Sequence, residues 1–114
     1  MQSSKSNLLQ GTLEILILKT VALGPIHGYA IAQRIQQISG EVLQIQQGSL
    51  YPALYRLEHQ GFIASHWGES DNRRKAKYYR LTAAGRRRLQ DEMAYWKWLT
   101  GAVGIVLTAV PGDV

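Results

Sequence analysis

The sequence has no cysteine among its 114 residues. This absence excludes disulfide bonds, thiolate metal sites and cysteine nucleophiles. The histidines, His27, His59 and His66, fall on different expected elements, and no carboxylate pair joins them at the spacing of a metal site. The chain also lacks a glycine-rich phosphate loop and a nucleophile elbow. We therefore expect no metal, no cofactor and no catalytic residues, which argues against an enzyme.

Long apolar runs are missing as well. The least polar stretch, residues 99–110, would span about 18 Å as a helix, whereas the hydrocarbon core of a bilayer is roughly 30 Å thick. The first seven residues, MQSSKSN, are polar and lack the apolar segment of an export signal. We expect a soluble cytoplasmic protein without a membrane partner, built as one domain plus an appendage.

Positive charge is concentrated in one part of the chain. The net charge is +5 at pH 7, and no acidic residue interrupts the basic residues between positions 73 and 88. A basic patch of this kind favours a polyanionic partner. The eight cations of the patch are Arg73, Arg74, Lys75, Lys77, Arg80, Arg86, Arg87 and Arg88.

The first predicted helix, residues 8–23, is apolar on nearly every side. A helix of this kind must be covered all round, and in so small a domain we expect part of the cover to come from a partner chain. Gly24-Pro25 ends it, because proline cannot continue the hydrogen-bond ladder. An amphipathic second helix follows at residues 29–39. In the connector 41–47, apolar and polar residues alternate weakly, and this segment could form a short strand.

A third helix is predicted over residues 49–60, with Ser49 as its N-cap. Pro52 would then fall in the first turn, where its missing N–H has no intrahelical partner. The face opposite the inward-pointing leucines is polar and makes a candidate DNA reader. The inward row is Leu50, Leu54 and Leu57.

Two alternating segments, residues 62–69 and 76–81, predict a β-hairpin. Residues 70–72, Ser-Asp-Asn, supply turn chemistry between them, and three cations follow at 73–75. A hairpin with a cationic tip at residues 70–75 is typical of a wing.

The last predicted helix spans residues 83–110 and is capped by Thr82. Its apolar residues recur at spacings of four and three, which argues for packing against another helix. Gly101 and Gly104 weaken this helix, unless they permit a close approach of the second helix. The recurring residues are Leu89, Met93, Trp96, Thr100, Val103, Leu107 and Val110.

Three segments carry a resemblance to a known family: GTLEILILKTVALGPIHGYAIAQRI, GSLYPALYRLEHQGFI and GESDNRRKAKYYRLTAAGRRRL. Together they resemble the PadR family of bacterial transcriptional repressors, in its compact form with a short final helix. The resemblance implies a homodimer formed by the first and last helices and operator binding released by a ligand or signal. The expected fold is mainly α with a small β-hairpin: a flexible lead (1–7), a winged helix-turn-helix domain (8–82), a dimerisation helix (83–110) and a tail (111–114).

The expected partner is double-stranded DNA, with the third helix in the major groove and the wing on the backbone. Arg56 is the residue we expect to read a guanine edge, because its planar fork can donate to both O6 and N7. Arg86, Arg87 and Arg88 could contact DNA or form a solvated helix face. The predicted DNA-binding residues are Ser49, Tyr51, Pro52, Tyr55, Arg56, His59, Arg73, Arg74, Lys75 and Lys77.

The second expected partner is another copy of the chain. Trp96 could serve dimer packing, or could line a pocket for a small aromatic effector between subunits. Two other functions stay open: a protein-interaction module for an acidic protein, and an RNA-binding winged helix. The predicted dimer residues are Leu9, Leu13, Leu16, Ile17, Leu89, Met93, Trp96, Val103 and Leu107.

Overall fold

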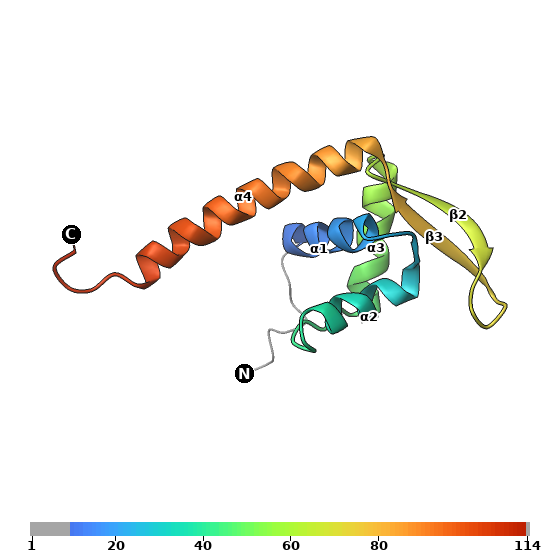
Figure 1. The fold of residues 1–114 in the computed structure, drawn as a ribbon, viewed down its shortest axis with the longest axis horizontal. Helices are drawn as coiled ribbons and strands as arrows, with labels where there is room; N and C mark the ends of the chain where they lie inside the picture. The colour runs from blue at the N-terminus through green and yellow to red at the C-terminus, as the bar shows by residue number, and fades with distance from the viewer. Residues whose placement is uncertain (1–9, 114) are drawn as a thin grey trace.

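The structure is a computed structural model and describes residues 10–113. A cluster of three helices has a β-hairpin projecting from one end, and a long last helix extends past the other (Figure 1). The elements in order are α1 (Gln10–Ala22), β1 (Ile26–His27), α2 (Gly28–Ile38), α3 (Gln47–His59), β2 (Ile63–Glu69), β3 (Lys75–Leu81) and α4 (Ala83–Leu107). This order confirms the mainly helical fold with a small sheet that the sequence predicts.

The core lies where α1, α2 and α3 meet the base of the sheet. Each helix contributes apolar residues at helical spacing, so that one side of each becomes dry. The leucine row of α3 is almost fully buried, as its spacing predicts. The most deeply buried side chains are Ile17, Leu18, Ile31, Leu50, Leu54, Leu57 and Ile63.

The described sheet has three antiparallel strands in the order β1-β3-β2. The register of the hairpin runs from Ile63 opposite Leu81 to Glu69 opposite Lys75. The third strand, β1, was absent from the sequence prediction, because two residues are too short to show an alternating pattern. The possible strand at 41–47 does not form, and this connector is irregular up to residue 46.

The start of α3 differs from the prediction. The helix begins at Gln47, so Ser49 lies inside its first turn and Gln46 takes the N-cap position without a side-chain hydrogen bond. The amides of Ser49 and Leu50 both donate to the Gln46 carbonyl oxygen, each at 3.0 Å. Pro52 consequently lies one turn inside the helix, where an N–H would have bonded to the carbonyl of Gly48.

The start of α4 is tied to the end of α3. The Thr82 hydroxyl accepts a 3.0 Å hydrogen bond from the amide of Gly85, which confirms the predicted cap, and donates to the Gly61 carbonyl at 2.7 Å. Gly85 is buried, and a Cβ there would overlap the carbonyl oxygen of Phe62. This contact requires glycine, because any side chain would push α4 away from the turn that begins the hairpin.

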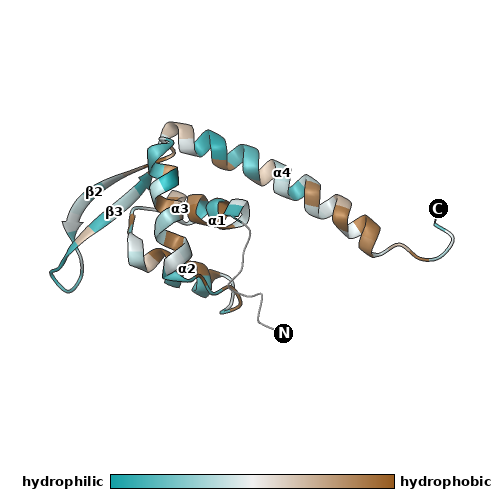
Figure 2. Ribbon diagram, turned by 180° about the vertical axis from the view of Figure 1, so that it is seen from behind, coloured by the Kyte–Doolittle hydropathy of each residue, from teal (hydrophilic) through white to brown (hydrophobic). Residues whose placement is uncertain are grey.

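Beyond its first turns, α4 leaves the domain and carries exposed apolar side chains. The distal part of the helix is mostly brown in Figure 2. The helix ends at Leu107, three residues before the predicted boundary at 110. None of the helices within residues 10–113 combines the length and hydropathy that a membrane crossing requires.

Candidate nucleic-acid interface

The solvent-facing side of α3 presents two rows of side chains. Ser49, Pro52 and His59 follow one row at helical spacing, and Tyr51 and Tyr55 follow the other. All five residues are exposed, as contact between this face and DNA would require. The rings of Tyr55 and His59 stack with their centroids 6.1 Å apart, so that the rows meet at the end of the helix.

Arg56 belongs to the first row, but it is not a free cation. Its Nε donates to Oε2 of Glu14 on α1 at 3.1 Å. The Glu14 side chain is 17% exposed and that of Arg56 36%, so solvent only partly screens the pair. The bond uses Nε and leaves the terminal guanidinium nitrogens for other acceptors. Glu14 was missed from the sequence, because no local spacing connects residues that lie 42 positions apart.

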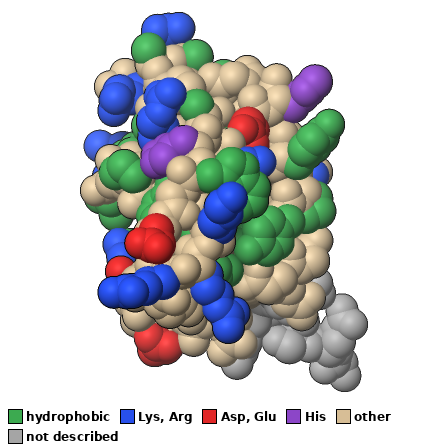
Figure 3. Space-filling view, turned by 90° about the vertical axis from the view of Figure 1, so that its right-hand side faces the viewer, with side chains coloured by type: hydrophobic (Ala, Val, Ile, Leu, Met, Phe, Trp, Pro, Cys, Tyr) green, Lys and Arg blue, Asp and Glu red, His purple; other side chains and the backbone are tan. Residues whose placement is uncertain are grey.

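The tip of the hairpin is a tight turn that presents cations. The amide of Ser70 donates to the Arg74 carbonyl at 2.8 Å, and Arg73 adopts a left-handed backbone conformation with φ of 63°. The side chains of Arg73, Arg74 and Lys75 are exposed, and no carboxylate in residues 10–113 forms an ion pair with them. Figure 3 views this end of the molecule and shows Lys and Arg side chains spread among exposed hydrophobic ones.

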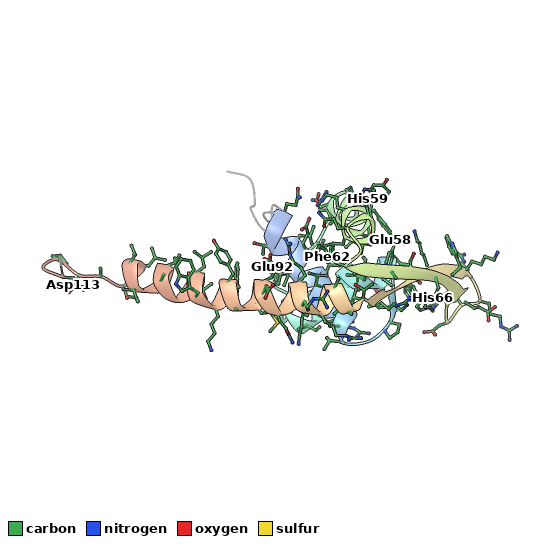
Figure 4. The ribbon with its side chains drawn as sticks, turned by 90° about the horizontal axis from the view of Figure 1, so that it is seen from above. Glu58, His59, Phe62, His66, Glu92 and Asp113 are labelled. Carbon is green, nitrogen blue, oxygen red and sulfur yellow. The ribbon has the colours of Figure 1, made fainter. Side chains whose placement is uncertain are left out.

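Lys77 differs from the tip cations, because a carboxylate of α3 holds it. Its Nζ lies 3.4 Å from Oε1 of Glu58, and the hydroxyl of Ser65 donates to the other oxygen of the same carboxylate. Glu58, labelled in Figure 4, therefore joins α3 to both strands near the middle of the hairpin. These contacts set the angle between the α3 face and the hairpin.

Tyr79 lies below this junction and is buried in the core. Burial, followed by the charge of Glu58 and by Tyr51, raises the pKa of the Tyr79 phenol above its ordinary value. The phenol therefore stays protonated over the physiological pH range. The Nζ of Lys77 lies 5.8 Å from the centre of its ring.

The three histidines lie on three different elements, although His27 and His66 both lie against the ring of Tyr78. His59 is at the end of α3, whereas His66 lies on β2 (Figure 4). His27, on β1, contacts Tyr29 and Tyr78 with ring centroids 4.4 and 5.4 Å apart. No group of three or more potential metal ligands occurs within the described part of the chain.

A hollow of about 470 Å³ separates α2 and α3 from the inner face of the hairpin. Two aromatic residues on its lining, Tyr29 and Trp67, were not among the predicted site residues. Trp67 had a signal in the sequence, since it alternates with Ile63 and Ser65 and must share their side of the strand. Tyr29 had none, because only the packed fold places the start of α2 beside the wing.

The predicted dimer residues separate into two groups. Leu13, Ile17 and Leu89 are at most 7% exposed, buried in the core of the chain itself. This corrects their assignment, because a buried side chain offers no surface to a second copy. The exposed or partly exposed residues are Leu16, Met93, Trp96, Val103 and Leu107, whereas Leu9 lies outside the described residues.

An apolar groove of about 400 Å³ runs between α1 and α4. Ile15 and Leu16 form its α1 side, and Met93 and Trp96 form its α4 side. Trp96 is 46% exposed, so that one chain leaves much of the indole uncovered. Large apolar side chains are costly to expose, and the groove is therefore a surface suited to a further binding partner.

The three arginines at the start of α4 differ in their contacts. The Nε of Arg88 lies 3.1 Å from Oε2 of Glu92 one turn later, and its guanidinium lies over the ring of Phe62 at 5.2 Å. Arg86 and Arg87 are exposed. Arg88 therefore belongs to the packing of the helix surface, as the solvated-face interpretation expects.

Residues 17–91 match the sequence profile of the transcriptional regulator PadR-like family. Among proteins of similar sequence, the transcriptional regulator Rv3488 of Mycobacterium tuberculosis is 32% identical over 83 residues, which is 73% of this chain and 74% of that protein.

Solved structures agree with this match. The crystal structure of a PadR family transcriptional regulator from Eggerthella lenta superposes with a TM-score of 0.74 at 35% identity, covering 89% of this chain and 86% of that one. A transcriptional regulator from Clostridium thermocellum gives a TM-score of 0.77 at 28% identity, covering 87% and 96%.

Proposed function

The chain belongs to the PadR-like family of transcriptional regulators, and we propose that it is a homodimeric repressor that binds a palindromic operator in the bacterial cytoplasm. Members of this family regulate transcription by binding DNA, are typically dimeric, and are not enzymes.

One observation carries the proposal: the exposed face of α3 lies beside a hairpin whose tip cations have no carboxylate partner within residues 10–113. A helix fits the major groove, where each base pair presents a distinct pattern of donors and acceptors. Cations at a hairpin tip bind phosphates and release counterions. In the proposed complex, residues 49–60 read bases and residues 70–75 hold the backbone.

The groove between α1 and α4 supports the dimer. A second copy would cover Leu16, Met93 and Trp96 in the groove and Val103 and Leu107 on the projecting part of α4. Two-fold symmetry then pairs the α3 helices, so that operator half-sites should be centred about 34 Å apart or a multiple of this distance. Small-angle scattering should give twice the chain mass, and Val103→Glu, which places a charge on the exposed stripe, should give the mass of one chain.

In vitro selection from random double-stranded DNA with the full chain tests the function. The proposal expects a palindrome to be enriched. If no sequence is enriched, sequence-specific DNA binding is wrong for this protein. In that case, binding to single-stranded or A-form RNA, or to an acidic protein, would identify which alternative use of the same face is correct.

An effector completes the proposal. A flat aromatic molecule could enter the α1–α4 groove against the exposed Trp96 indole, with the second copy as its other wall. Such a ligand should quench tryptophan fluorescence in the wild type and have no such effect in Trp96→Leu. A panel of aromatic compounds that leaves the emission unchanged would refute this part of the proposal.

A further inference from the structure

We propose that the hollow between α2, α3 and the inner face of the hairpin seats a single phosphodiester group of the DNA backbone. Lys75 and the hydroxyls of Tyr29 and Tyr51 would bind the phosphate oxygens, and Trp67 would pack against the adjoining deoxyribose. This inference rests on the proposed function and gives it a defined point of backbone contact. Tyr29 and Trp67 thereby join the binding surface.

The lining of the hollow has the chemistry of a phosphate site. Tyr29 and Tyr51 line the hollow and are about half exposed, at 47% and 45%. Lys75 lies on the same side of β3 as Tyr79 and lines the hollow without an ion pair in residues 10–113. An ammonium and neutral hydroxyls are all donors, whereas a phosphodiester offers only acceptors.

The walls are held in place before any ligand arrives. A Cβ on Gly28 would lie 3.2 Å from a ring carbon of Tyr51, so that glycine lets α2 approach that ring closely. Lys77, the second cation of the lining, is fixed by Glu58. A site whose donors are already positioned loses less entropy when it binds its ligand.

Two further side chains on the lining lack a binding partner that a ligand in the hollow could supply. Trp67 is 67% exposed, although an indole is costly to leave in water. The Nδ1 of His27 is buried and has no hydrogen-bond partner in the described chain. A buried polar atom without a partner requires an explanation, and a ligand or water in the adjacent hollow can supply the missing bond.

The position of the hollow indicates the DNA backbone rather than a base. It lies between the helix proposed for the major groove and the hairpin proposed to hold the backbone, and both contribute to its lining. A strand that passes from one element to the other must cross the hollow. Trp67 supplies a flat apolar wall, which suits a sugar beside the phosphate better than an isolated anion.

The test replaces single phosphates of the selected operator with neutral methylphosphonates. In the wild type, a methylphosphonate at the phosphate seated in the hollow should lower the affinity about tenfold, as expected for hydrogen bonds to a charged group. Phosphates bound by the cations of the hairpin tip should be sensitive as well, so the seated phosphate is the position whose effect depends on Lys75 and Tyr29. In Lys75→Gln and in Tyr29→Phe, the unmodified operator should bind more weakly, and the methylphosphonate at that position should have little further effect. Both substitutions are at exposed positions, and unchanged thermal unfolding confirms that each variant is folded.

Lys97→Gln is the matched control, because it removes the same charge from an exposed site on α4, the helix that extends away from the hairpin (Figure 1). It should retain the full tenfold loss at the critical phosphate. If Lys75→Gln and Tyr29→Phe also retain it at every position, the phosphate seat is refuted while operator binding stands. If the wild type selects no duplex at all, the proposed function fails and this inference fails with it.

Trp67 provides a second readout. Operator binding should change the tryptophan emission of the wild type, and Trp67→Phe should abolish that change. Inorganic phosphate, added alone as a probe, should give no saturable change, because the proposed ligand includes the sugar. Saturation by phosphate would overturn the proposal in favour of a pocket for a free anion. If operator binding changes the emission of Trp67→Phe as much as that of the wild type, Trp67 does not contact the DNA and the proposal is also overturned.

Discussion

The ion pair between Glu14 and Arg56 gives the sharpest prediction about sequence recognition. Because Glu14 engages Nε of Arg56, the terminal nitrogens stay available as a fork for the O6 and N7 atoms of guanine. We predict that Arg56 reads one guanine in each half-site and that Glu14 holds the guanidinium in the orientation for reading. Arg56→Met removes the fork but keeps an apolar stem, whereas Glu14→Gln removes only the charge of the partner.

The magnitudes follow from the burial of the pair. A bidentate contact to guanine contributes about 1–3 kcal/mol of discrimination, which is roughly five- to 150-fold in relative affinity. Arg56→Met should abolish that preference, and Glu14→Gln should reduce it in part. The side chains are 36% and 17% exposed, so their mutual attraction should contribute only about 0.5–1 kcal/mol to folding.

Two measurements separate reading from folding. Binding to operators in which single G·C pairs are changed to A·T reports the preference, and urea unfolding of the two single variants and the double variant reports the coupling energy. An equal loss of affinity for every operator in Arg56→Met would refute the reading role. A coupling energy of zero would show that Glu14 does not hold the arginine in solution.

Other variants test the architecture and the wing. Gly85→Ala should lower the free energy of unfolding by about 2–3 kcal/mol in thermal or urea unfolding, because its Cβ would overlap a backbone carbonyl, whereas Gly101→Ala, in open space, should not destabilise. The pKa of Tyr79 is raised in the folded state, so the stability that its neutral phenol contributes is present below about pH 10 and is lost as the pH rises through the folded-state pKa. The free energy of unfolding of Tyr79→Phe should therefore fall less than that of the wild type between about pH 9 and 11. Arg74→Ala should reduce the magnitude of the slope of log affinity against log salt by about 0.9 for each phosphate that the arginine neutralises in the wild type. Lys77→Ala should reduce this slope less, because Glu58 already neutralises the Lys77 ammonium. An unchanged slope in Arg74→Ala would contradict the wing assignment.

Most of the fold could be predicted, because the elements that define it have strong local patterns. The leucine row of α3, the alternating strands of the hairpin and the Thr82 cap each depend on residues a few positions apart. The two parts that were missed, β1 and the start of α3, left no such pattern in the sequence. β1 exists only because Ile26 and His27 pair with β3, and the true start of α3 reflects backbone bonds to Gln46 rather than the capping preference of Ser49.

The candidate site was predicted less completely than the fold, since burial depends on every neighbour of a helix. The stripe on α1 was interpreted as one dimer surface, yet Leu13 and Ile17 face the core while Leu16 faces the groove toward α4. A helix that is apolar all round does not reveal which side the rest of its own chain covers.

The basic residues show why charge alone could not assign the interface. Arg56 and Lys77 were predicted to bind DNA, but a carboxylate from another element holds each of them, and no local sequence pattern connects the partners. Phosphate must therefore compete with Glu58 for Lys77, whereas Arg74 and Lys75 carry no such cost. The electrostatic part of DNA binding should accordingly come from the hairpin tip, and the paired cations should set geometry. The number of counterions released will then be smaller than the count of basic residues suggests.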